Sequence, residues 1–221
     1  MTPADSDPRR HGIFWVFHLD WPTPPGLAPR LPASFVRLGP EAAEPLARAM
    51  RLDDPAEVLR RFEAGRRCYA AQVEGALAAY GWVSFIEEMI GEMRLRVRMV
   101  PGEAYIWDCA TAPAHRQQRL YTALLAHILN ELRAEGLCRA WIGTDRENVA
   151  SQKGIATCGF RPVADVVVER VLGMPLVRAR GWPGVPEHIV EAARGVLLGD
   201  RDRAWLAALS SARPGSDGAS V

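Results

Sequence analysis

The sequence lacks paired cysteine motifs, long apolar runs and an excess of charge of either sign, and each absence excludes a class of protein. Without C-x-x-C spacing, its four cysteines indicate the reduced thiols of a cytoplasmic protein and not a disulfide framework or a zinc site. The apolar run from Gly12 to His18 is too short to cross a membrane and leads straight into a group of prolines. A net charge of +1 provides no field that would recruit nucleic acid. We therefore expect a cytoplasmic protein without a membrane partner, a nucleic-acid partner or a metal site.

What is present is the composition of an ordinary globular protein. The chain has 221 residues, of which 48% are hydrophobic and 24% charged, enough for one sizeable core. Residues 1–33 are expected to form an N-terminal arm, in which Gly12 to His18 is an extra strand or a packing element and Trp21 to Pro32 is a proline-rich strap. The main domain is expected at residues 34–175, followed by a C-terminal extension at 176–221 whose end is disordered.

The stretch from Ala104 to Phe160 is the most informative part of the chain. Its first residues, up to Thr111, are apolar and aromatic, as expected of a strand, and Pro113 ends that pattern. From Leu120 the apolar residues recur with helical spacing until Gly136, which predicts an amphipathic helix of about four to five turns. A strand, a turn and a long helix are therefore expected in direct succession.

Basic and amide side chains stand where that helix begins, at His115, Arg116, Gln117, Gln118 and Arg119. The first backbone N–H groups of a helix have no partner within the helix, and the helix dipole adds partial positive charge at this end. Such a helix start binds phosphate readily. A solvated first turn without any ligand has the same composition, so the later segments must decide between the two interpretations.

The remaining segments predict an α/β (α+β) fold with a mixed, largely antiparallel sheet and helices on both faces. One hairpin is expected where Cys68–Val73 and Ala76–Phe85 flank Glu74 and Gly75. A second is expected where Arg94–Val100 and Ala104–Thr111 flank Pro101 and Gly102. The other expected elements are strands at Ser34–Leu38 and Phe160–Val171 and helices at Glu41–Leu52 and Pro55–Ala64.

One combination of motifs resembles a known family. The run Pro113-x-His115-Arg116-Gln117-Gln118-Arg119-Leu120-Tyr121, a Leu-rich helix, Asn148-x-x-Ser151 and Gly159-Phe160 together resemble the GNAT superfamily of acyl-CoA-dependent N-acyltransferases. Taken singly, Asn148 is an ordinary helix cap and Gly159 an ordinary helix stop. Their order and spacing favour the family, which implies a GNAT-like acyltransferase domain at residues 34–175. The resemblance also implies acetyl-CoA, or another short acyl-CoA, as cofactor.

The resemblance further implies a set of cofactor-binding residues. In the family the turn holds the CoA pyrophosphate, and the splayed end of the fourth strand holds the pantetheine arm. Carried over, the set is Ala110, Thr111, Arg116, Gln117, Gln118, Arg119, Leu120, Tyr121, Asn148 and Ser151. Arg119 and Tyr121 stand where the family usually has small residues. An arginine at 119 either replaces close backbone approach by a charge-assisted contact or marks a site that binds CoA poorly.

Asp108 is the candidate catalytic residue, as the base that takes a proton from the attacking amine. Strict alternation along the strand would place it on the face of Ile106 and Ala110, where burial would raise its pKa toward a useful value. A buried aspartate that only satisfies neighbouring backbone groups is the alternative. Many family members have a tyrosine that protonates the departing thiolate at the position of Ile155. In this chain the proton for the thiolate would come from solvent, from Tyr121 or from a residue elsewhere. Tyr80 is a weaker candidate, because its position on a strand is more typical of a packed aromatic side chain.

The acceptor side has less specific signals. Three arginines, Arg94, Arg96 and Arg98, alternate with apolar residues and would form one charged strand face. That face either receives an acidic acceptor or is a solvated edge that discourages aggregation. The side chains of Trp82 and Trp107 either line an acceptor pocket or serve the core.

These observations lead to two hypotheses of function. The first is an enzyme that moves an acetyl or similar short acyl group from acyl-CoA to an amine of a small-molecule acceptor. The second is a catalytically silent GNAT-fold module that acts through a partner protein. A homodimer is compatible with either hypothesis.

Overall fold

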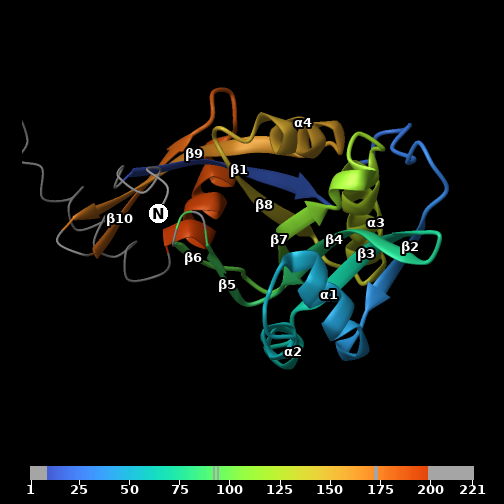
Figure 1. Cartoon of the computed structure of the whole chain (residues 1–221). Helices are drawn as coiled ribbons and strands as arrows, with labels where there is room; N and C mark the ends of the chain where they lie inside the picture. Colours follow the sequence, from blue (N-terminus) through green and yellow to red (C-terminus); the bar gives the residue numbers. More distant parts are fainter. Residues whose placement is uncertain (1–8, 92, 94, 172–173, 199–221) are drawn as a thin grey trace, which may run out of the picture.

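The computed structural model describes residues 9–91, 93, 95–171 and 174–198. An eight-stranded sheet forms the body of the molecule, in the spatial order β10-β9-β1-β8-β7-β4-β3-β2 (Figure 1). Neighbouring strands are antiparallel except β7 and β8, which run parallel. The strands are β1 (Arg9–His18), β2 (Ser34–Leu38), β3 (Arg67–Val73), β4 (Ala76–Ser84), β7 (Glu103–Thr111), β8 (Arg139–Asp145), β9 (Arg161–Val171) and β10 (Met174–Gly181).

Helices pack against both faces of this sheet, and the expected mixed, largely antiparallel fold is confirmed. One face carries α3 (Leu120–Ala134) and α4 (Val149–Thr157), whose apolar side chains share a core with alternate residues of the strands. The other face carries α1 (Ala43–Met50) and α2 (Ala56–Glu63), together with the helical residues 187–198. Short 3-10 turns, η2 (Pro40–Ala42) and η3 (Pro113–His115), precede α1 and α3. Within the described residues, none of the helices is long and apolar enough to cross a membrane.

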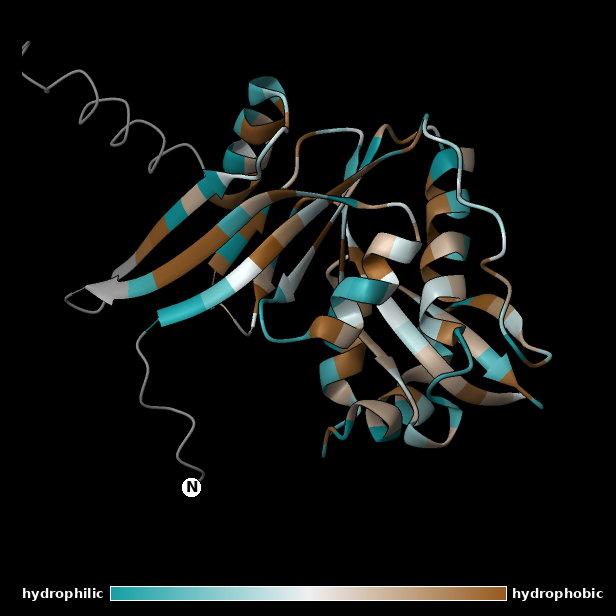
Figure 2. Cartoon of the chain, turned by 90° about the horizontal axis from the view of Figure 1, so that it is seen from above, coloured by the Kyte–Doolittle hydropathy of each residue, from teal (hydrophilic) through white to brown (hydrophobic). Residues whose placement is uncertain are grey.

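The N-terminal segment is an inner strand of the sheet. Strand β1 pairs with β8 on one side and with β9 on the other. Its residues Ile13 to Phe17 are all buried. Helices α3 and α4 cover one face, and the segment 187–198 and the hairpin of β5 (Glu87–Ile90) and β6 (Leu95–Arg98) cover the other. This two-sided burial explains an uninterrupted apolar run in place of alternation. In Figure 2 the strand passes from teal at its first residues to brown in its middle.

The second expected hairpin, around Pro101 and Gly102, is wrong. The strand that precedes these residues is β6 (Leu95–Arg98), and it pairs with β5 (Glu87–Ile90) in a separate two-stranded sheet and not with β7. The carboxylate of Glu87 pairs with Arg96 and Arg98 across that sheet, while Leu95 and Val97 are buried. The apolar face of β6 therefore joins the core, and its arginine face is solvated. This agrees with the interpretation of the arginine face as a solvated edge. Arg94 and the end of the C-terminal extension lie outside the described residues.

Strands β7 and β8 pair only along their first halves. The parallel register runs from Glu103 opposite Arg139 to Ile106 opposite Ile142, and no further pairs follow although both strands continue. Beyond this point β7 bulges: Asp108 has a φ of 42°, in the left-handed region, and the register between β7 and β4 shifts. The two strands therefore separate toward their carboxyl ends and leave an opening between them.

The proline-rich segment between β1 and β2, residues 19–33, is a strap across α3. The guanidinium of Arg133 on α3 holds its first residues, donating to the carbonyls of Leu19 at 2.7 Å and Trp21 at 2.8 Å and to the hydroxyl of Thr23 at 3.3 Å. Further along, Pro24 packs beneath Gly159, where an added Cβ would lie 3.0 Å from the proline ring. The strap is thus fixed to α3 by one multiply bonded side chain.

We expect Arg133→Ala to lower the free energy of unfolding by about 2–3 kcal/mol, because two strap carbonyls lose charge-assisted donors. Urea unfolding followed by tryptophan fluorescence measures the change. Arg133→Lys is the matched control and should recover only part of the loss, since one ammonium cannot reach all the acceptors of a guanidinium. An unfolding free energy within about 0.5 kcal/mol of wild type in the alanine variant would show that Arg133 does not anchor the strap.

Candidate functional site

Two cavities meet at the opening between β7 and β8. The first, here called the inner pocket, has a volume of about 400 Å³ and lies toward α2 and the β5–β6 hairpin. The second, here called the outer groove, has a volume of about 1200 Å³ and lies between the strap, the turn before α3, and α4. Both cavities are lined by Cys109, Tyr121, Asn148 and Ser151. A ligand that fills the groove can therefore reach the inner pocket at these four residues.

The outer groove contains nearly all of the residues that the sequence predicted to bind a cofactor. Its lining includes Ala110, Thr111, Arg116, Gln117, Arg119, Leu120, Tyr121, Asn148 and Ser151. Gln118 does not line the groove, and its carbonyl instead accepts a hydrogen bond from the backbone N–H of Arg30 in the strap at 3.0 Å. The lining also includes Lys153 on α4 and His115. The groove therefore combines a helix start with several basic side chains, which suits an anionic ligand.

The turn before α3 has a left-handed backbone at two residues that are not glycine. Gln117 has a φ of 63° and Arg119 a φ of 61°. Each such residue costs roughly 1 kcal/mol relative to a glycine. The turn shape expected of a glycine-containing sequence is thus present without the glycine.

The strap stabilises this turn and forms one wall of the groove. The Arg119 guanidinium donates to the carbonyl of Gly26 at 3.3 Å, and the Arg30 guanidinium donates to the carbonyl of Gln117 at 3.3 Å. Pro25, Gly26, Leu27 and Arg30 all line the groove. Sequence reasoning missed this wall, because a proline-rich segment far from the turn carries no signal of where it packs.

Asn148 performs the capping role that its sequence context allowed. Its side-chain oxygen accepts a hydrogen bond from the backbone N–H of Ser151 at 3.0 Å, at the start of α4. In the described part of the chain no protein group accepts from its amide nitrogen. The cap leaves this nitrogen available at the junction of the two cavities, so the structural and the binding interpretations are compatible.

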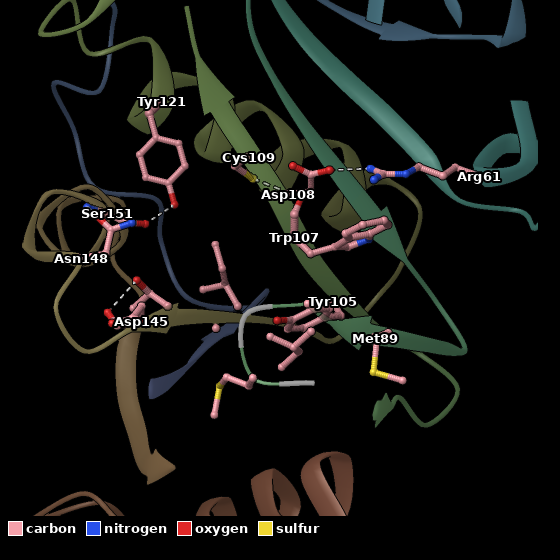
Figure 3. A pocket seen from close by; sticks show the side chains of 16 residues that line it. Arg61, Met89, Tyr105, Trp107, Asp108, Cys109, Tyr121, Asp145, Asn148 and Ser151 are labelled. Atoms are coloured by element: carbon pink, nitrogen blue, oxygen red, sulfur yellow. Dashed lines mark hydrogen bonds and ion pairs between the residues drawn. The ribbon is translucent and has the colours of Figure 1, made fainter. Parts of the chain in front are cut away.

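Tyr121 bridges α3 and α4 at the junction (Figure 3). Its hydroxyl lies 3.1 Å from the hydroxyl of Ser151, and its ring lies against Gly154. A Cβ at Gly154 would lie 2.6 Å from the ring, so glycine is required for this packing. Burial raises the pKa of Tyr121 far above its usual value. The side chain is therefore a neutral hydroxyl at ordinary pH, able to donate or accept a hydrogen bond.

Asp108 lies in the inner pocket, but not as strict alternation predicted. The left-handed bulge turns its side chain out of the alternating pattern, and the side chain is 32% exposed. Its carboxylate forms an ion pair with Arg61 of α2 at 2.5 Å (Figure 3). The expected burial of Asp108 is thus wrong, and its carboxylate is instead partly exposed and paired with a positive charge.

The neighbouring Cys109 is not suited to be a nucleophile. Burial raises the pKa of its thiol well above the usual value, and the negative charge of Asp108 raises it further. Because the thiolate is the reactive form of cysteine, a protonated thiol disfavours a covalent acyl-cysteine intermediate.

Several side chains with a predicted role lie in the core and away from the two cavities. Ile155 and Trp82 are fully buried, and Tyr80 is 6% exposed in the cluster under α1 and α2. Trp107, by contrast, lines the inner pocket as one interpretation expected. Arg61 and Asp145 also line it and were not predicted, because neither belongs to a recognisable motif.

Comparison with known proteins agrees with this geometry. A model of the acetyltransferase (GNAT) family matches residues 34–160. A GNAT-family structure from Novosphingobium aromaticivorans is 18% identical with a TM-score of 0.51, covering 72% of this chain and 62% of that one. A GNAT acetyltransferase from Colwellia psychrerythraea is 16% identical with a TM-score of 0.51, covering 72% of this chain and 55% of that one. The chain thus spans less than two thirds of either protein, and at this identity the likeness concerns the fold alone. A search of curated proteins found no match.

We expect Gly154→Ala to lower the free energy of unfolding by about 1–3 kcal/mol, because the new methyl group collides with the Tyr121 ring. The same change in a Tyr121→Ala background should instead be neutral or stabilising by up to about 1 kcal/mol, the helix propensity gained by alanine. Urea unfolding of the four proteins in this cycle measures the coupling. Equal effects of Gly154→Ala in both backgrounds would contradict the packing of Tyr121 against α4.

Proposed function

The chain belongs to the GNAT acetyltransferase family, and on that premise we propose that it transfers an acetyl or similar short acyl group from acyl-CoA to an amine of a small-molecule acceptor. The observation that carries the proposal is the meeting of two cavities at the open end of β7 and β8. The outer groove has the chemistry of a site for a phosphorylated ligand, and the inner pocket contains a carboxylate beside the junction. Two ligands bound in this way bring their reacting ends together, which removes much of the entropic cost of the reaction.

The phosphates of CoA would lie in the outer groove at the start of α3. The N-terminal N–H groups of α3 have no intrahelical partners, and the groove adds the side chains of Arg116, Arg119 and Arg30. Charged donors thus compensate for the missing glycine at position 119. The backbone of Ala110 and Thr111, which lies beyond the last β7–β8 pair and lines the groove, would bind the pantetheine arm. Asn148 would bind the same arm with its free amide nitrogen.

Asp108 is the proposed base, and it accepts a proton from the acceptor ammonium before attack. The free amine then bonds to the thioester carbonyl carbon, the carbon–sulfur bond breaks with its electron pair on sulfur, and the former amine nitrogen loses its surplus proton to solvent. Tyr121 would donate a proton to that sulfur and regain one from solvent, a role supported by the position of its hydroxyl at the junction of the cavities. This assigns to α3 a role that many family members give to a tyrosine at the position of Ile155, which here is a core residue.

The absence of that tyrosine from α4 also supports the second hypothesis, a catalytically silent module that acts through a partner protein. On that alternative, the Tyr121–Ser151 contact closes the passage between groove and pocket. The two functions differ in whether an acyl group leaves CoA, so the binding and turnover experiments that follow discriminate them. We favour the enzyme because Asp108 and the neutral Tyr121 hydroxyl both line the inner pocket.

Acetyl-CoA is expected to bind the wild-type protein with micromolar affinity in isothermal titration calorimetry. Arg116→Ala and Asn148→Ala should each weaken binding by about tenfold, the effect of one lost charge-assisted or amide hydrogen bond. Arg48→Ala, on the exposed face of α1, is the control and should bind as wild type does. Unchanged affinity in both site variants would remove the groove as the cofactor site, and absence of binding by wild type at millimolar ligand would favour the silent module.

Asp108→Asn is expected to lower kcat by a factor of about 100 or more while the affinity for acetyl-CoA stays the same, because only proton removal is lost. Release of free CoA thiol, followed with a colour-forming disulfide reagent, measures the rate. Full activity of the variant would exclude Asp108 as the base.

Tyr121→Phe should lower kcat by about tenfold or more with acetyl-CoA. The defect should shrink with an acyl donor whose thiol is more acidic, because such a thiolate leaves without a proton. Thermal unfolding controls for packing, since phenylalanine keeps the ring against Gly154. An equal defect with both donors would mean that Tyr121 acts through structure and not as a proton donor.

A further inference from the structure

The side chain of Arg61 is held in a fixed position at the wall of the inner pocket. It lies in the last turn of α2, with its guanidinium carbon 4.7 Å from the ring centre of Trp107 and 5.2 Å from that of Trp82. Its carboxylate partner is Asp108 at 2.5 Å. Stacking on two indoles and one ion pair leaves the guanidinium little freedom, so it is preorganised to bind a further group.

Arg66 shows by contrast what a purely structural arginine looks like in this protein. It also lies near the Trp107 ring, at 5.6 Å, but it bonds to both oxygens of Glu88, a side chain that is only 4% exposed. Arg61 donates through one nitrogen to the carboxylate of Asp108, whose side chain is 32% exposed. Within the described residues no other protein acceptor bonds to its guanidinium. Arg61 therefore retains donors toward the pocket that Arg66 does not.

The pair Arg61–Asp108 presents a positive and a negative group side by side in the same pocket (Figure 3). A ligand that carries an ammonium next to a carboxylate can form two ion pairs here, one between its ammonium and Asp108 and one between its carboxylate and Arg61. Its ammonium would then contact Asp108, next to Cys109 at the junction of the cavities. A simple amine can form only the contact with Asp108, because it has no carboxylate to offer to Arg61.

The rest of the inner pocket limits the body of such a ligand. Its walls include the apolar or aromatic side chains of Met89, Tyr105, Trp107 and Ile142 and the polar side chains of Thr144 and Asp145. The volume of about 400 Å³ is near the lower end of the range for small-molecule sites. Thioether and aromatic walls accept apolar side chains of varied shape. The pocket thus favours a compact amine with an apolar body over a sugar or a polyamine.

From these contacts we infer that the acceptor is an amphoteric amine, an amino acid or close relative with an apolar side chain, and that Arg61 binds its carboxylate. The inference rests on the proposed transfer to an amine and adds the chemical class of the acceptor. Arg61 then determines specificity by binding the carboxylate of the right ligand, a contact that amines without a carboxylate cannot make.

The test compares matched acceptors that differ only in the carboxylate: L-phenylalanine with phenethylamine, L-leucine with isoamylamine, and L-methionine with its decarboxylated amine. Thiol release from acetyl-CoA gives kcat and KM for each. Wild type should prefer at least one amino acid over its partner by about tenfold or more in kcat/KM. Arg61→Ala should lose this preference, because its KM for the amino acid rises more than its KM for the decarboxylated amine. Arg61→Lys should keep part of the preference.

Arg60→Ala is the matched control, since Arg60 precedes Arg61 on α2 but is exposed and does not line the pocket. It should keep the wild-type preference. Equal or better turnover of the decarboxylated amines by wild type would overturn the inference, as would a preference that survives in Arg61→Ala. Turnover of none of the carboxylated amines by a protein that binds acetyl-CoA would also overturn it. Failure of wild type to bind acetyl-CoA would instead contradict the proposed function itself.

Discussion

The early end of hydrogen bonding between β7 and β8 is the feature on which the site depends. Pairing ends at Ile106 and Ile142, and the left-handed residue Asp108 keeps the two strands from pairing again. Unpaired strand edges normally attract another strand, so this gap must be held open by the structure around it. The tails of β7 and β8 line the two cavities there, and Cys109 borders both of them. The bulge in β7 thus helps to keep open the gap in the sheet at which the two cavities meet.

The N-terminal segment also keeps this gap open, by pairing with the edge of β8 that faces away from β7. Because β1 occupies the free edge of β8 and pairs with it along its length, β8 cannot shift toward β7. The chain then continues as the strap, which Arg133 fixes to α3, and reaches the turn at Gln117 and Gln118 through Arg30. One continuous segment therefore orders both the sheet beside the passage and the wall of the outer groove. The family match at residues 34–160 leaves this segment out, although the structure depends on it.

Sequence patterns predicted the local elements well and the long-range contacts poorly. The turn before α3, the long helix and the Asn148 cap follow from short-range chemistry, and the structure places them together in one groove. Alternation failed at Asp108 because a single left-handed residue reverses the side-chain direction without any compositional signal. The hairpin at Pro101 and Gly102 failed because β6 has a better partner in β5, whose Glu87 complements its arginines. Arg61 could not be found, since its relation to Asp108 exists only after α2 packs on the sheet.

Two of the three departures from the family pattern, Tyr121 and Ile155, are coupled in space through α4. Tyr121 replaces a small residue at the start of α3, and Gly154 on α4 provides the room for its ring. The tyrosine hydroxyl then lies at the junction, so the position of Ile155 is free to serve the core, where it is fully buried. Arg119 replaces a second small residue, and its side chain reaches the strap carbonyl of Gly26 and not the interior of the turn. A site that had merely decayed would show unrelated losses. Here Tyr121 supplies a hydroxyl that the position of Ile155 lacks, so these two departures are related and are not independent losses.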